Sequence, residues 1–115
     1  MKQIEENVRK AIDAGIEIWK KGHFPYIPHV LHWVDLRAQE QGIPMDWADY
    51  MLWDAPWLDD CDALFLLMES KGALLEYQRA KEEGKILFHS IDEIPSVNRK
   101  PTWADVHFDE HSENQ

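Results

Sequence analysis

Two acidic residues, Glu76 and Asp54, have surroundings in the sequence that suit acid–base or nucleophilic chemistry. Glu76 falls in the first turn of a helix expected after the apolar run 63–68, where backbone amides and the helix dipole would keep its carboxylate ionised. Asp54 follows Trp53 and precedes Trp57, and this apolar setting would favour its protonated form. One ionised and one protonated carboxyl group are what cleavage of a glycosidic bond requires. Acidic residues at such positions also serve as simple helix caps or dipole partners, so that alternative stays open.

Further residues are candidates for ligand binding. Ser70 and Gly72 precede the same helix, where backbone amides and a hydroxyl could hold an anion. His29 and His32 could share a helix face, but a metal would need a third ligand, and no other residue has a suitable spacing. We therefore expect no metal, and expect both histidines to line a pocket and bind a sugar or phosphate. Trp53 belongs either to the core or to a wall on which a base stacks.

The candidate residues would be positioned by helices and strands that alternate along the chain. The spacing of apolar residues predicts where helices and strands lie, and glycine and proline positions predict where they end. The expected elements are a helix at 4–21, a short strand at 24–28, helices at 29–41 and 46–58, strands at 63–68 and 85–89 separated by a helix at 73–83, and a helical turn at 90–94. This alternation implies an α/β layer fold with a parallel sheet.

The length and net charge of the chain limit the number of domains and the kinds of partner that we expect. The 115 residues suffice for one domain, expected at 1–95, followed by a polar tail or docking arm at 96–115. The net charge of −10 would repel nucleic-acid polymers and anionic membrane surfaces. The single cysteine, Cys61, excludes an internal disulfide and fits the reducing cytoplasm. Neither a signal peptide nor a membrane span is expected.

Three sequence segments resemble the nucleoside 2-deoxyribosyltransferase superfamily, which includes deoxynucleoside 5′-monophosphate N-hydrolases. WDAPWLDDCDALFLL and ESKGALLEYQRAKEEGKILF resemble the second half of its domain, and AGIEIWKKGHFPYIPHVLHW resembles the helix–strand–histidine segment of small relatives. The resemblance covers roughly residues 4–95. It implies a three-layer, flavodoxin-like or Rossmann-like parallel sheet with helices on both faces. The family's first strand and its Gly-Pro-Tyr-like loop are absent from the chain.

The resemblance also implies roles for individual residues. Glu76 matches the nucleophile that attacks the anomeric carbon, Asp54 the acid that helps the base depart, and Ser70 the serine that holds a 5′-phosphate. The implied substrate is a (deoxy)nucleoside or nucleoside 5′-monophosphate, and no cofactor is implied. The alternative is a non-catalytic nucleotide-binding or interaction module. We expect a homo-oligomer, in which the sheet closes up or borrows a segment such as 102–108 in place of the absent strand.

Overall fold

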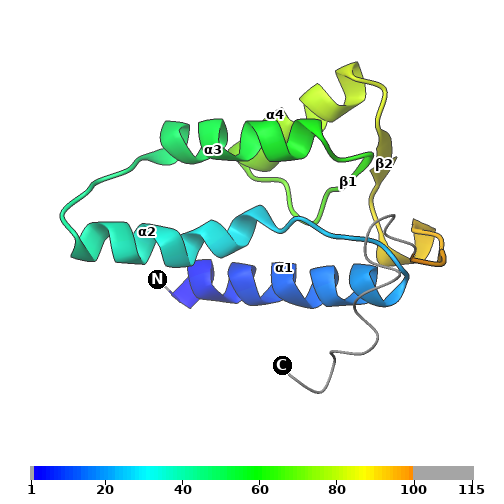
Figure 1. The fold of residues 1–115 in the computed structure, drawn as a ribbon, viewed down its shortest axis with the longest axis horizontal. Coiled ribbons are helices and arrows are strands. Elements are labelled where there is room, and N and C mark those ends of the chain that lie inside the picture. Colours follow the sequence, from blue (N-terminus) through cyan, green and yellow to red (C-terminus); the bar gives the residue numbers. More distant parts are fainter. Residues whose placement is uncertain (1, 100–115) are drawn as a thin grey trace, which may run out of the picture.

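The computed structural model describes residues 2–99 and consists mainly of helices (Figure 1). The helices are α1 (Lys2–Lys20), α2 (Leu31–Glu40), α3 (Trp47–Asp59) and α4 (Lys71–Glu82), with short 3-10 helices η1 (Pro28–Val30) and η2 (Ile91–Glu93). The two strands are β1 (Ala63–Phe65) and β2 (Ile86–Phe88). The four predicted long helices and the predicted turn after the last strand are confirmed.

The predicted three-layer parallel sheet is wrong for the described residues. β1 and β2 pair in parallel over three residues each, with Ala63 opposite Ile86 and Phe65 opposite Phe88, and they form the whole sheet of residues 2–99. The strand expected at 24–28 is instead a connection that enters η1. Pro25 and Pro28 lack the N–H groups that a paired strand would donate.

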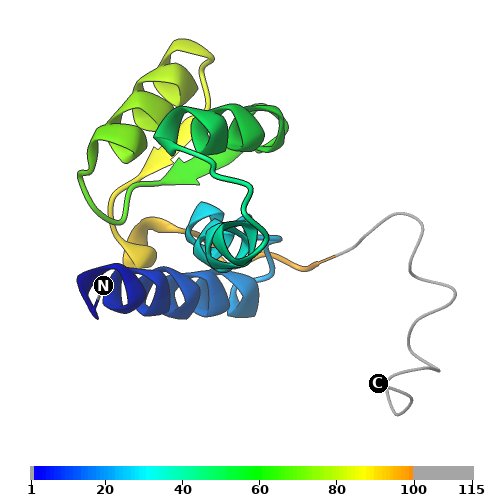
Figure 2. The ribbon, with the colours of Figure 1, turned by 90° about the vertical axis from the view of Figure 1, so that its left-hand side faces the viewer.

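The two strands lie between two helical layers. Figure 2 shows α3 and α4 on one side of β1 and β2, with η2 and α1 on the other. The most buried apolar side chains are mainly small and come from both layers; they are Val8, Ala11, Ala38, Ala80 and Ile94. The larger aromatic side chains of Trp19 and Trp57 lie outside this core, since they are 46% and 56% exposed.

The ends of α3 and α4 follow local sequence signals. Asp46 accepts from the Asp49 amide and the Asp49 side chain accepts from the Asp46 amide, which confirms the predicted helix start. A proline inside a helix commonly kinks or ends it, yet α3 runs through Pro56 to Asp59. Together these features place Asp54 in the interior of a helix rather than at a cap.

Residues 96–99, expected to belong to a separate tail, contact the end of α1. The Val97 amide donates to the Lys21 carbonyl at 2.7 Å, and the Arg99 guanidinium lies 3.4 Å from the Trp19 ring centre. The strand-like segment expected at 102–108 lies outside the described residues. Among residues 2–99, no helix combines the length and the apolar character needed to cross a membrane.

Gly22 tests the contact between α1 and residues 96–99. Gly22 and Gly42 both have positive φ, at 101° and 72°, so alanine at either costs about 1–2 kcal/mol of backbone strain. A Cβ at Gly22 would also collide with the Val97 carbonyl, whereas one at Gly42 meets open space. We therefore expect Gly22→Ala to lower the free energy of unfolding, measured in urea, by clearly more than Gly42→Ala. Equal losses would show that the Val97 contact does not contribute.

Candidate functional site

Asp54 and Glu76 lie together where α3 packs against α4. Asp54 is 6% exposed and is the one buried polar or charged residue among those described. Glu76 is half-buried, and Asp54 is close enough to raise its pKa. The structure therefore brings together the two acids singled out from the sequence, although they are 22 positions apart in the chain.

Burial and the nearby Asp54 together favour the protonated form of Glu76. Burial, then the charge of Asp54, then the hydrogen bond with Asp54 raise the pKa of Glu76 from 4.5 to about 8. Near neutral pH Glu76 is therefore mostly protonated, and the prediction that it is held ionised is wrong. The physical reason is its position: α4 begins at Lys71, and its first turn contains no acidic residue. Glu76 lies deeper in the helix, where the dipole is weak and burial dominates.

Tyr26 joins this pair and was not among the residues predicted from the sequence. Its hydroxyl donates to Asp54 Oδ1 at 2.8 Å, and its ring stacks on Trp57 with centroids 6.0 Å apart and planes 15° apart. Burial and the hydrogen bond to Asp54 raise the pKa of Tyr26 above its usual range. The one sequence signal for Tyr26 is its position within the segment bounded by Pro25 and Pro28, where the prolines restrict the backbone.

His29 also lies within the electrostatic influence of Asp54. Burial lowers the pKa of His29, and the charge of Asp54 partly opposes this effect. His29 is therefore a mainly neutral imidazole near neutral pH, able to donate or accept a hydrogen bond. That His29 binds a sugar or phosphate stays a prediction.

A cavity of about 200 Å³ adjoins Glu76 between α3, α4 and β1. Its walls are mostly apolar, and Met51, Ala55, Leu64 and Leu75 contribute to them. Asp54 and Tyr26 do not line this cavity. Glu76 is thus the member of the pair that faces the space in which a small group could bind.

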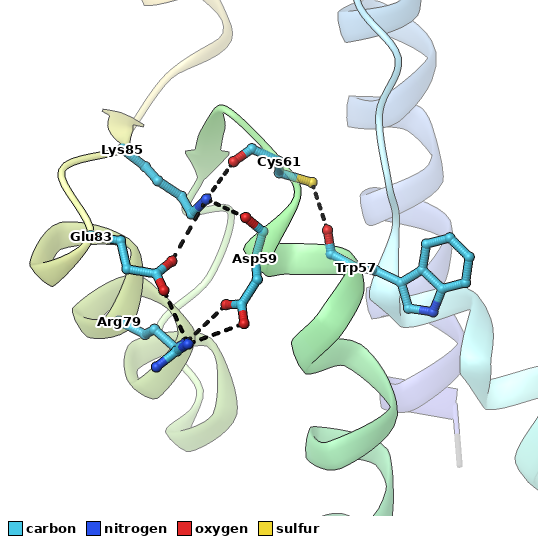
Figure 3. Close-up of polar contacts among 6 residues, drawn as sticks. All are labelled: Trp57, Asp59, Cys61, Arg79, Glu83 and Lys85. Atoms are coloured by element: carbon cyan, nitrogen blue, oxygen red, sulfur yellow. Dashed lines mark hydrogen bonds and ion pairs between the residues drawn. The ribbon is translucent and has the colours of Figure 1, made fainter.

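An ion-pair network borders this cavity (Figure 3). Arg79 of α4 donates to both carboxylate oxygens of Asp59 at 2.8 and 3.0 Å and pairs with Glu83 at 3.0 Å. The ammonium of Lys85 donates to the carbonyls of Asp59 and Cys61 at 2.8 and 2.5 Å. These bonds fasten the end of α3 to the end of α4 and to the residue that precedes β2.

Ser70 and Gly72 lie at the N-terminus of α4. The Ser70 hydroxyl accepts from the Ala73 amide at 3.1 Å and so caps the helix. A Cβ added to Gly72 would lie 3.2 Å from Met51 Sδ and Trp47 Nε1, so this glycine allows α4 to approach α3 closely. Both residues have clear structural roles, and phosphate binding by them stays a prediction.

His32 and Trp53 have no recorded contact with the acid pair. His32 lies in α2 with its ring 4.9 Å from that of Trp33, and its buried Nε2 has no hydrogen-bond partner among the described residues. Trp53 is 42% exposed on α3. Within residues 2–99, no three His, Cys, Asp or Glu side chains are grouped so that they could hold a metal ion.

Comparison with known proteins assigns the chain to no family. No family model, no curated protein and no solved structure matches the chain.

The raised pKa of Glu76 predicts a specific pH dependence of stability. The unfolded chain loses this proton near pH 4.5 and the folded chain near pH 8, so the stabilisation is complete below pH 4.5 and is lost as the pH rises towards 8. Glu76→Gln removes the titration. We expect this variant to gain stability relative to the natural chain from about pH 5 to 8, by at most about 1.4 kcal/mol per pH unit.

Urea unfolding at several pH values measures this difference. Glu82→Gln, at an exposed position on the same helix, is the matched control and should retain the pH trend of the natural chain. If the free energies of unfolding of Glu76→Gln and the natural chain differ by the same amount at every pH in this range, Glu76 ionises normally.

Proposed function

We propose that this chain cleaves the N-glycosidic bond of a (deoxy)nucleoside or nucleoside 5′-monophosphate, with Asp54 and Glu76 as the reacting acids. The observation that supports the proposal is the paired carboxyl groups with a proton held on Glu76 near neutral pH. Departure of a base from a sugar needs both an anionic oxygen facing the sugar cation and a proton for the leaving nitrogen. A carboxyl pair with a single proton supplies both.

In the proposed reaction, the proton first moves within the pair. Glu76 transfers its proton to Asp54 through their hydrogen bond, which leaves a carboxylate on the wall of the cavity. An oxygen of Glu76 then attacks the anomeric carbon as the bond to the base breaks, and the bonding electrons leave with the base nitrogen. Asp54 returns the proton to that nitrogen and then deprotonates the water that hydrolyses the glycosyl ester on Glu76. Because Asp54 is 6% exposed and does not line the cavity, both proton transfers require a movement that opens Asp54 to the substrate.

The size of the cavity favours a small ligand group. Sites for drug-sized ligands commonly enclose about 300–1,000 Å³, and the space beside Glu76 has about 200 Å³. This volume suits a pentose ring more closely than a whole nucleoside. The base would therefore extend out of the cavity, and its recognition would involve residues beyond the cavity walls.

The first test measures release of free base from a panel of deoxynucleosides and deoxynucleoside 5′-monophosphates. Glu76→Gln and Asp54→Asn should each lower the rate at least about 100-fold, because each removes a group that transfers a proton or attacks carbon. Activity of the natural chain should fall above about pH 8, where the pair loses its proton. Glu82→Gln should leave the rate unchanged.

Two results would contradict the proposal. One is base release that persists in folded Glu76→Gln and Asp54→Asn variants. The other is absence of base release across the whole panel; if nucleotides then still bind by calorimetry, the non-catalytic binding module becomes the better hypothesis.

A further inference from the structure

Tyr26 contacts α3 at two positions that lie about one helical turn apart on the same face. Its hydroxyl binds Asp54, and its ring stacks on Trp57, three residues further along α3. Residues three apart lie on neighbouring parts of a helix face. A single tyrosine therefore fixes both its own orientation and the orientation of the Asp54 carboxylate.

The backbone around Tyr26 is held as well. Ile27 packs on α1 so closely that a Cβ on Gly15 would collide with its side chain. The Ile27 carbonyl also accepts from the Val30 amide at 3.1 Å, which turns the chain into η1. Tyr26 thus approaches Asp54 from a segment fastened to α1, and not from a freely moving loop.

Tyr26 does not contact the cavity directly. It is absent from the cavity wall, and Figure 3 shows the Trp57 indole, on which it stacks, pointing away from the ion-pair network that borders the cavity. Tyr26 therefore acts on a ligand beside Glu76 indirectly, and its hydrogen bond to Asp54 is a contact that can transmit this effect. This makes it a candidate positioning residue.

We propose that Tyr26 determines which of the two paired acids carries their shared proton. Its hydroxyl donates to Asp54, so it stabilises the anionic form of that carboxylate and leaves the proton on Glu76. The titratable groups that act on this contact come from three further elements: Glu76 of α4, His29 of η1 and Cys61 before β1. Tyr26 differs from these three groups because its hydroxyl donates a hydrogen bond to Asp54 at 2.8 Å.

The role of Tyr26 in turnover rests on the proposed function, but its effect on the proton does not. If the proton must move from Glu76 to Asp54 before attack, the hydrogen bond from Tyr26 holds the pair in its resting form. The position of the proton can be measured in the folded chain without substrate.

Carbon-13 NMR titration of the Asp54 and Glu76 carboxyl groups tests the inference on the full chain. Tyr26→Phe keeps the ring that stacks on Trp57 and removes only the donor. In this variant the ratio of protonated Glu76 to protonated Asp54 should fall about tenfold, because the anionic form of Asp54 loses one hydrogen-bond donor. In an Asp54→Asn background, Tyr26→Phe should no longer change the titration of Glu76.

Tyr50→Phe is a matched control, because the Tyr50 hydroxyl donates to Asp35 Oδ1 at the same 2.8 Å distance. It should leave the titration of Asp54 and Glu76 unchanged. Identical carboxyl titrations in Tyr26→Phe and in the natural chain, with both chains folded, would overturn the inference. An altered titration in a chain that releases no base would instead contradict the proposed function alone.

Discussion

Two neighbouring carboxyl groups, one buried and one half-buried, cannot both be charged at low energetic cost. Asp54 is buried inside α3, and Glu76 faces it from α4, so one proton must remain with the pair over much of the pH range. The hydrogen bond from Tyr26 favours the proton on Glu76. The protonation, the orientation of the acids and the proposed chemistry all depend on this contact between two helices.

Contacts at both ends of α3 and α4 fix the position of the two helices relative to each other. At one end, Arg79 and Lys85 bridge α4 and the start of β2 to the last residues of α3. Near the other end, Gly72 lets α4 approach Met51 and Trp47. The short β1–β2 pair joins the segments that precede and follow α4. The acids are therefore held by regular elements at both ends of the site, which favours a fixed geometry.

The helices of this chain could be predicted from local signals, and the sheet could not. Asp46, Ser70 and the glycines at positions 22 and 84 mark helix ends by capping or by positive φ, effects that depend on neighbouring residues alone. The apolar run 63–68 was predicted as a longer strand, but strand length depends on the partner, and β2 offers only three residues. The two acids were identified from the sequence, whereas Tyr26 and the raised pKa of Glu76 arise from contacts between distant segments.

The central claim is that Asp54 and Glu76 together retain a proton near neutral pH. Infrared spectroscopy of the folded chain measures this directly, since a protonated carboxyl group has a carbonyl band distinct from that of a carboxylate. At pH 7 we predict a protonated-carboxyl band that disappears as the pH is raised past about 8 and is absent from Glu76→Gln. A spectrum of the natural chain with no such band at pH 7 would contradict the account.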